Sequence, residues 1–299
     1  ENGRTHCRRP IKRASTRSTT EWGRLLMATF SGVWIDGTKL QDEGIRVKLS
    51  SSEPLLTGSR HNTVSIPQRA GAYYYGGQLE PKPFTLDCVF TRSNYADLKA
   101  RITKFKRLLI DGNGRPKVVQ LRFDDEPDRY YNVVYEGQID IERIADLGVF
   151  SVQLIAYDPV AYSVAMSDEI SWGSTTAVFL SDYSMGHTGS FSKRFTSSGT
   201  TTVVVTGDNV KPIINVTGSG TNVTIKFNAR VLTLGTFTNS TWVIDLAEYT
   251  ILKNGANALG DVSGPWMSME LVRGTNTVTV GGTGLSIDVA FEYRDKWHG

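Results

Sequence analysis

Apolar and polar residues alternate along short segments of the first half of the chain, and this period of two predicts β-strands. Turn dipeptides such as Asp36-Gly37 and Asp158-Pro159 end two of these segments, as is typical of hairpins and strand ends. The predicted strands cover residues 30–35, 45–50, 84–90, 118–123, 129–142 and 148–159. Residues 51–83 are rich in Ser, Gly and Pro, which predicts a loop.

A single segment of the first half has helical spacing. The apolar residues of its predicted inner face are Leu98, Ile102, Phe105 and Leu109. Asn94 is the predicted N-cap, and the glycines and proline of 111–116 predict the end of the helix. Lysines and arginines between residues 99 and 107 could form an RNA-binding face, but a solvent-exposed helix back is the favoured interpretation. Strands, one helix and further strands together predict an α+β domain.

The pattern changes after about residue 165, where Ser, Thr and Gly dominate and helical spacing disappears. The predicted strands of this half cover residues 200–207, 212–218, 222–228, 231–237, 242–246, 276–282 and 286–294. Many short strands separated by turn residues predict an all-β sandwich. We therefore expect an N-terminal segment of residues 1–26, a first domain of residues 27–165 and a second domain of residues 166–299.

The N-terminal segment changes the interpretation of the charge. The chain has 33 Lys and Arg against 30 Asp and Glu. Residues 1–26 hold seven of the basic and two of the acidic residues, so that 26 basic face 28 acidic residues in the rest. The segment lacks hydrophobic periodicity, which predicts disorder. Our hypothesis is that Met27 is the natural start and that residues 1–26 lie upstream of it; the alternative is a basic arm that binds nucleic acid.

No pattern of catalytic or metal-binding residues stands out. The sequence has no phosphate-binding loop, dinucleotide fingerprint or nucleophile elbow. His61, His187 and His298 are isolated in sequence, and Cys88 lies in an apolar strand, where a buried thiol is expected. The acidic run 124–128 could hold Ca²⁺, but a solvated hairpin loop is favoured. We expect no enzyme activity, no cofactor and no metal site.

Carbohydrate binding is the alternative function that the composition leaves open. Trp242, Trp266 and Trp297 of the second half could form a sugar-stacking face, as in a carbohydrate-binding adhesin. Packing in the core of a sandwich is the commoner fate of such residues. A glycosidase would need two carboxylates at a set separation, and nothing in the sequence supports such a pair.

A cluster of tyrosines stands in the segment IPQRAGAYYYGGQLEPKPF, residues 66–84. If the segment is extended, Tyr73 and Tyr75 point to one side and Tyr74 to the other. Tyrosine offers a large apolar area and a hydroxyl group, which suits subunit interfaces, sugar platforms and cores. The pattern alone leaves these three uses open.

Several segments carry a resemblance to the distal tail proteins of long-tailed bacteriophages, in particular those that infect Gram-positive hosts. The segments of the first half are 66–90, with its Ile-Pro-x-Arg-x-Gly-x-Tyr motif, the helix of 94–116, the acidic hairpin of 121–140 and the strand of 148–163 that ends in aromatic-Asp-Pro-x-Ala-Tyr. In the second half, 211–234 resembles the opening of the family's galectin-like sandwich, and 291–297 its aromatic-Arg-x-x-Trp ending. Gln68 replaces the glycine that the family has after Ile-Pro.

The resemblance implies a mainly β protein, with an N-terminal α+β domain followed by a galectin-like all-β sandwich. It implies a structural hub at the tail tip of the virion, assembled in the cytoplasm of the bacterial host. The N-terminal domains would form a hexameric ring. The implied partners are the tail tube protein, the tail-tip protein, the tape-measure protein and a receptor-binding protein, without sequence-specific nucleic acid and without a membrane.

Two segments and the basic face of the helix are our candidates for the subunit and partner interfaces. The candidate residues are Arg69, Tyr73, Tyr74, Tyr75, Asp124, Asp125, Arg129, Tyr130 and Tyr131. For the tyrosine segment we predict a split, in which one side packs within the subunit and the other contacts a neighbour.

Overall fold

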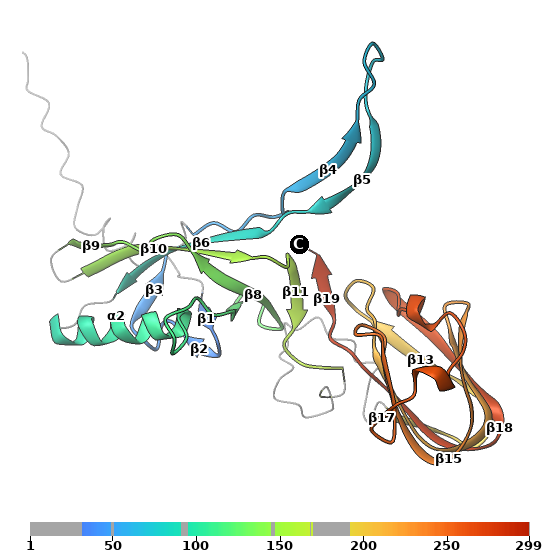
Figure 1. Cartoon of the computed structure of the whole chain (residues 1–299). Coiled ribbons are helices and arrows are strands. Elements are labelled where there is room, and N and C mark those ends of the chain that lie inside the picture. The colour runs from blue at the N-terminus through green and yellow to red at the C-terminus, as the bar shows by residue number, and fades with distance from the viewer. Residues whose placement is uncertain are drawn as a thin grey trace, which may run out of the picture.

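The structure is a computed structural model that describes residues 32–48, 51–90, 95–144, 147–167, 169 and 192–298. Over these residues the protein is mainly β with one α-helix, as predicted. Two large sheets lie side by side, and a two-stranded arm extends away from the first (Figure 1). The hypotheses about residues 1–26 and about the Asn94 N-cap lie outside the described residues.

The first sheet follows the order β2-β1-β7-β8-β10-β6-β3, with β9 paired to β10 and β11 paired to β8. Its strands are β1 (Val33–Ile35), β2 (Thr38–Lys39), β3 (Ile45–Val47), β6 (Lys82–Phe90), β7 (Val119–Phe123), β8 (Arg129–Glu136), β9 (Ile141–Ile144), β10 (Leu147–Ala156), β11 (Val160–Ser163) and β19 (Lys296–His298). All of the pairings are antiparallel. The six strands predicted for this half are therefore present. β2 and β11 are additional strands of the same half, and β19 is an additional strand from the end of the chain.

Two positions in the first sheet show how local residues determine where a strand ends. Asp36 and Gly37 both have positive φ values, 51° and 76°, as the tight hairpin turn predicted for this dipeptide requires. The predicted strand 129–142 is wrong in one respect, because it ends at Glu136 and a separate strand begins at Ile141. Gly137, with φ of 74°, lies at the break, since this backbone conformation favours glycine.

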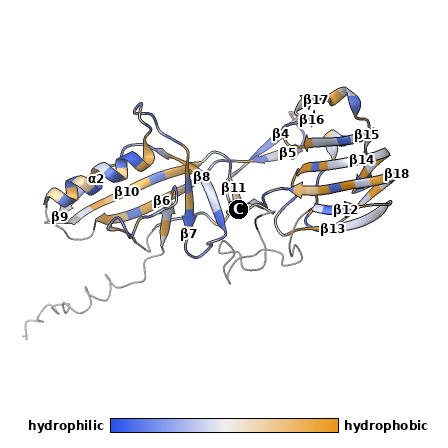
Figure 2. Cartoon of the chain, turned by 90° about the horizontal axis from the view of Figure 1, so that it is seen from below, coloured by the Kyte–Doolittle hydropathy of each residue, from blue (hydrophilic) through white to orange (hydrophobic). Residues whose placement is uncertain are grey.

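The helix α2 (Tyr95–Leu109) covers the first sheet through the face that its spacing predicts. Leu98, Phe105 and Leu109 are buried in the same hydrophobic cluster as the sheet residues Phe90 and Phe150. The Phe105 and Phe150 rings meet edge to face at 5.4 Å. Figure 2 shows α2 alongside β10, with hydrophobic and hydrophilic residues alternating along its turns.

The predicted loop of residues 51–83 is wrong over most of its length. Residues 59–79 form the arm, a hairpin of β4 (Ser59–Val64) and β5 (Tyr73–Leu79) that pairs with no other strand of the described chain. The register shifts between His61↔Gly77 and Thr63↔Tyr74, so that two residues of β5 face one of β4. Such a bulge twists and bends a hairpin, which fits the curved arm of Figure 1.

The second sheet curls over itself, because its central strands are long and bend along their length. They are far longer than the strands that the sequence predicts. Its strands are β12 (Ser192–Phe195), β13 (Gly199–Val205), β14 (Ile213–Phe227), β15 (Arg230–Asp245), β16 (Thr250–Lys253), β17 (Ala256–Asn257) and β18 (Gly274–Glu292). Three pairs of predicted strands are continuous as β14, β15 and β18. Their predicted turns are bends inside a strand, where the register shifts near Gly218 and Gly220.

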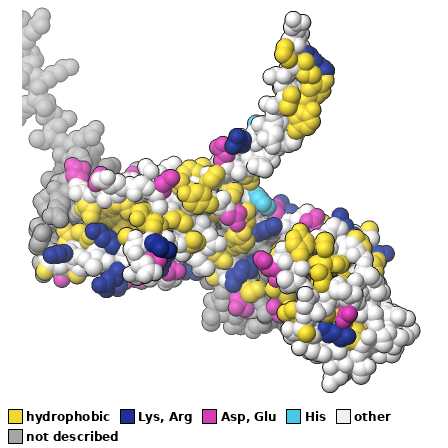
Figure 3. Space-filling model, viewed as in Figure 1, with side chains coloured by type: hydrophobic (Ala, Val, Ile, Leu, Met, Phe, Trp, Pro, Cys, Tyr) yellow, Lys and Arg dark blue, Asp and Glu magenta, His cyan; other side chains and the backbone are white. Residues whose placement is uncertain are grey.

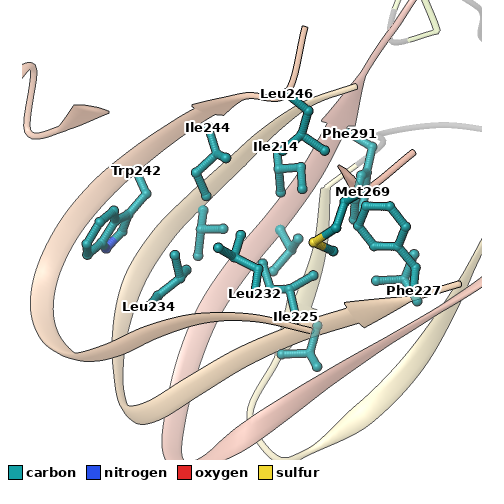
Figure 4. Close-up of a cluster of buried hydrophobic side chains, with 14 of the residues drawn as sticks. Ile214, Ile225, Phe227, Leu232, Leu234, Trp242, Ile244, Leu246, Met269 and Phe291 are labelled. Carbon is teal, nitrogen blue, oxygen red and sulfur yellow. The ribbon is translucent and has the colours of Figure 1, made fainter. Parts of the chain in front are cut away.

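The inside of this curl is the hydrophobic core of the second half. Figure 4 shows side chains of β14, β15 and β18 pointing toward one another across it. Trp242, Ile214 and Ile244 have no exposed surface. Of two short 3₁₀ turns, Leu259–Asp261 and Trp266–Ser268, the second adds the buried Trp266 side chain to this core. The sandwich therefore gets its two layers from bent strands.

The last strand of the chain returns to the first sheet. β19 pairs with β11, with Ala161 opposite Trp297, and the C-terminus lies between the two sheets (Figure 1). The Trp297 side chain packs against the core of the first sheet. The domain boundary between residues 165 and 166 stays a prediction. If the second domain begins at residue 166, its last strand, β19, pairs with β11 of the first sheet.

Gly207 has no side chain, and this allows the backbone of β19 to pass close to it. A larger residue at this position is therefore expected to lower the stability of the protein. A Cβ at Gly207 would lie 2.4 Å from the carbonyl oxygen of Lys296 and 2.8 Å from its nitrogen. Gly207→Ala is therefore expected to push β19 away and to lower the free energy of unfolding by about 1–3 kcal/mol. Hydrogen exchange at residues 296–298 and thermal unfolding measure this effect. Gly260→Ala is the control, since a Cβ there meets nothing within 4 Å; equal loss in both variants would contradict the prediction.

Candidate functional site

The arm of residues 59–79 presents apolar side chains that its own chain leaves uncovered. The large exposed residues on it are Val64, Ile66, Tyr73, Tyr74, Tyr75 and Leu79. Figure 3 shows hydrophobic side chains along the arm, with a basic group near its tip. Residues 59–79 contain two arginines and no carboxylate. A basic, apolar and protruding hairpin is suited to contact another protein.

The predicted split of the three tyrosines is wrong, because none of them is buried. Tyr73 is 41% exposed, Tyr74 64% and Tyr75 67%. The reason is that the hairpin has only two strands and no layer behind it, so that both of its faces meet solvent. Their contacts are local: the Arg69 guanidinium lies 4.6 Å from the Tyr73 ring centre, and the Tyr74 ring meets the His61 ring at 5.6 Å.

A buried lysine lies where the arm joins the sheet. The Lys82 side chain is 3% exposed, donates a hydrogen bond to the Tyr131 hydroxyl at 3.1 Å and pairs with Glu53 at 3.0 Å. Burial alone would lower the pKa of Lys82, but the bonds to Tyr131 and Glu53 outweigh it and the pKa is raised. The ammonium group therefore stays charged and joins the segment before the arm to the strand after it. Sequence reasoning missed this lysine, because a polar residue at the start of a strand predicts exposure.

The hydrogen bond between Lys82 and Tyr131 gives a second prediction. Tyr131→Phe removes the acceptor from a buried ammonium group, and hydrogen bonds to charged groups contribute about 1.5–3 kcal/mol. We expect the free energy of unfolding to fall within that range, as measured by urea denaturation at pH 7. Tyr135→Phe is a control in the same strand, since Tyr135 lies at the edge of the same core. The prediction fails if the two variants are equally stable.

The acidic turn between β7 and β8 holds the second group of candidate residues. Asp124 accepts hydrogen bonds from Trp34 Nε1 at 2.6 Å and from Lys39 Nζ at 2.7 Å. Burial would raise the pKa of Asp124, but these two bonds outweigh it and the pKa is lowered. Asp125 and Glu126 are exposed. Asp128 is buried. The turn thus has two carboxylates held within the chain, Asp124 and Asp128, and two at the surface.

The remaining candidates of this segment lie inside the protein. Tyr130 and Tyr131 are buried, and the Arg129 guanidinium lies 4.1 Å from the Trp297 ring centre of β19. These three side chains make contacts within the chain, and their place at an interface stays a prediction. The structure therefore separates the nine candidates: four lie on the arm, two are on the acidic turn and three pack around β8.

A pocket of about 320 Å³ lies beside the acidic turn. Its walls include Val33, Val47, Leu86 and Phe123, and its polar residues are Lys48, Ser51, Ser52, Glu53, Asp125 and Glu126. A second pocket of about 280 Å³ lies under α2 and is lined mainly by apolar residues of the helix and of the sheet. Lys106 is the charged residue in the wall of that second pocket. The two pockets therefore differ in the charge that they present.

The sugar-stacking face of three tryptophans is wrong. Trp242 has no exposed surface and Trp266 is 6% exposed, both within the core of the second half. Trp297 belongs to the first sheet, where it lies under Arg129. Tryptophan in a bent sandwich is drawn to the core because it has the largest apolar area to bury.

The described residues bring together no group of three or more His, Cys, Asp or Glu side chains that could hold a metal ion. Cys88 is buried, as predicted, and burial raises the pKa of its thiol to about 12, so that the reactive thiolate is not populated at neutral pH. None of the described helices is both long and apolar enough to cross a membrane. What the surface offers is the arm, the acidic turn and the pocket beside that turn.

Comparison with known proteins finds a family match within the first half of the chain. Residues 38–156 match the family model described as the phage tail protein RIFT-related domain. The fold of the whole chain is similar to the Dit protein (gp 19.1) of phage SPP1, with a TM-score of 0.63 and 17% identity over 90% of this chain and 99% of that one. Weaker similarity, with TM-scores of 0.39 and 0.40 and 11% and 10% identity, links it to chains of the phage p2 baseplate in its activated conformation with Sr and with Ca; these cover 89% of this chain and 98% of each other chain. No curated protein sequence matches the chain.

Proposed function

We propose that this chain, whose residues 38–156 form a phage tail protein RIFT-related domain, is a non-enzymatic structural hub at the tail tip of a long-tailed phage. It forms a hexameric ring that joins the tail tube to the tail-tip and receptor-binding proteins during host adsorption. The observation that carries the proposal is the match of this domain to a phage tail family, together with the segments that resemble distal tail proteins.

The similarity in fold supports the proposal over the rest of the chain. The Dit protein of phage SPP1 is described as a paradigm of hub adsorption apparatus in Gram-positive infecting phages, and its fold extends over 90% of this chain. Most of the second sheet falls within that share, so the similarity in fold is not limited to the residues that the family model matches. For residues 166–299 we propose a galectin-like sandwich, from the resemblance of segments 211–234 and 291–297. The family match and the fold therefore favour the same kind of protein.

The arm supports an assembly of several copies. A two-stranded hairpin alone is marginally stable in water, and an uncovered strand edge is a site for pairing or contact with another chain. Three exposed tyrosines on such a hairpin are typical of an interface, where aromatic residues are enriched. A closed ring requires a heterologous contact, in which an arm on one side meets a different surface on the next copy.

The proposed partners follow from a position at the end of the tail. One face of the ring meets the tail tube protein, the other meets the tail-tip protein, and the tape-measure protein lies along the axis. The second domains project outward and hold receptor-binding proteins. The protein is assembled in the cytoplasm of the bacterial host and functions in the virion.

Native mass measurement of the purified chain tests the ring. We expect a species of six times the 33.0 kDa of the chain, alone or after addition of the tail tube protein, and negative-stain images with six-fold symmetry. Monomers at high protein concentration in both conditions would contradict the proposal.

A further inference from the structure

We propose that the pocket under α2 and the free edge of β9 together bind an extended segment of a partner protein. The segment adds a strand beside β9, places apolar side chains in the pocket and carries carboxylates that meet lysines of α2. Every part of this site lies within one copy of the chain, so the inference goes beyond the proposed ring and does not depend on it.

The pocket lies where the row of strands beside β10 is interrupted. β6 pairs along one edge of β10, while β8 and β9 follow each other along the other edge, with a break between Glu136 and Ile141. The pocket lies at this break, with a volume of about 280 Å³, and its lining includes Ile102, Ile110, Tyr135, Ile139 and Ile141. Since an engineered cavity of about 150 Å³ binds a benzene molecule, the pocket has room for about two apolar side chains.

The pocket is open at the surface of the protein. Ile102, Ile139 and Ile141 are each partly exposed. Figure 3 shows hydrophobic side chains gathered on the surface between α2 and the strands above it, with Lys and Arg side chains along the helix. Apolar surface that water reaches favours association with another apolar group. The pocket therefore favours an occupant with apolar side chains.

β9 has a free backbone edge next to this pocket. Among the described strands it pairs with β10 alone, so that the N–H and C=O groups of its other edge have no partner strand there. Ile141 of β9 and Phe150 of β10 lie opposite each other and both line the pocket. The pocket is therefore on the face of the sheet that α2 covers, and a strand added along the free edge would turn alternate side chains toward it.

The helix side of the pocket is basic. Lys106 lies in the wall of the pocket, and Lys99 lies on the same side of α2, about two turns earlier. Both are exposed, and neither forms an ion pair within the residues that the structure describes. Lys104 lies on the opposite side of the helix and pairs with Glu43 at 2.6 Å. Two ammonium groups beside an apolar pocket favour an occupant that carries carboxylates.

The same charges disfavour exposed segments of a second copy as occupants. The arm has two arginines and no carboxylate, and residues 1–26 hold seven basic against two acidic residues, so both would meet like charge at Lys106. Residues 53–58 carry a glutamate and two exposed leucines. Their ends are held by backbone bonds of Ser52 and Gly58 to residues 80–85, which prevents them from lying along β9 as a strand. The occupant that fits is a segment of another protein.

Peptide binding to the full-length chain tests the site. The probe is the labelled peptide TETLTLTET, whose leucines and glutamates share one face when it is extended, and the control is TKTLTLTKT. Fluorescence anisotropy should show about tenfold tighter binding of the glutamate peptide, because the lysine peptide meets like charge at α2. Equal binding of the two peptides, or no binding of either, would overturn the inference.

Variants of the full-length chain test whether the peptide lies in the pocket. Lys106→Glu should remove the preference for TETLTLTET, and Ile139→Trp should fill the pocket and weaken binding about tenfold or more. Lys104→Glu is the matched control, since it changes the same charge on the opposite side of the same helix, and it should keep the preference. Circular dichroism checks that all three variants fold. A Lys106→Glu variant that binds as the control does would overturn the inference.

Hydrogen exchange tests the added strand. Backbone amides of residues 139–144 should exchange more slowly when TETLTLTET is bound, because the peptide backbone accepts hydrogen bonds from the free edge of β9. β12, an edge strand of the second sheet, should exchange at the same rate with and without the peptide. Binding that leaves exchange at residues 139–144 unchanged would overturn the addition of a strand.

The outcomes separate this site from the proposed ring. A chain that stays monomeric and binds the peptide in this way supports the inference and contradicts the ring. A ring that excludes the peptide, while the monomer binds it, would mean that a second copy covers the site, and this would overturn the assignment to a partner protein. Binding to both monomer and ring supports the inference and leaves the ring intact.

Discussion

Replacing Tyr73, Tyr74 and Tyr75 together by threonine is expected to abolish ring assembly and to leave the chain folded. The three side chains are exposed on the arm and contribute to neither hydrophobic core. Threonine keeps the preference for a strand, so the hairpin itself is preserved. Truncation of a hot-spot tyrosine in the centre of an interface costs about 2 kcal/mol or more, and the triple variant truncates three tyrosines at each contact between copies. Native mass measurement should show monomers in place of hexamers.

The matched control is Tyr157→Thr in the first half. Tyr157 is 65% exposed, close to the 64% of Tyr74 and the 67% of Tyr75, but it lies outside the arm. This variant should assemble normally, and circular dichroism should show the same unfolding temperature for it and for the triple variant. Normal assembly of the triple variant would show that the arm is a surface without a partner.

Trp242→Ala is expected to lower the free energy of unfolding more than Gly207→Ala or Tyr131→Phe. Trp242 has no exposed surface, contacts the Phe237 ring at 5.7 Å and lies under the Lys253 ammonium group at 4.9 Å. Removing a buried tryptophan leaves a cavity in the bent sandwich and costs about 3–5 kcal/mol. Urea denaturation followed by circular dichroism measures this loss.

Trp242→Phe separates packing from polarity at the same position. The Trp242 indole N–H has no hydrogen-bond acceptor within the described part of the chain. Burial of such a group costs about 1–3 kcal/mol, and phenylalanine removes it while filling most of the space. We therefore expect Trp242→Phe to lose much less stability than Trp242→Ala. Equal losses in the two variants would contradict this account of the core.

The sequence pattern predicted correctly those elements whose structure depends on residues close together in the chain. The inner face of α2 and the Asp36-Gly37 turn are confirmed because spacing and turn chemistry act within a few residues. The bends inside β14, β15 and β18 were wrongly predicted as turns, because the residues at the bends are typical turn residues. Asn222, Asn239 and Gly282 do have positive φ values there, but whether such residues end a strand or bend it depends on the neighbouring strands.

Other features depend on contacts far apart in the chain. The arm looks like a loop in sequence because glycine and proline flank its tyrosines, and its strands are stabilised only by each other. β19 lies opposite a strand more than a hundred residues earlier. Among the interface candidates, Tyr130 and Tyr131 were expected at the surface, whereas antiparallel pairing with β11 and β7 places both in the interior.

The position of the protein in the virion is the most direct test of the hub. Gold-labelled antibodies against the second half of the chain, applied to intact phage particles that carry this protein, should bind at the distal end of the tail. Averaged images of that region should show a ring of six copies around the tail axis. Labelling of the capsid, or along the tail shaft with none at its tip, would contradict the account.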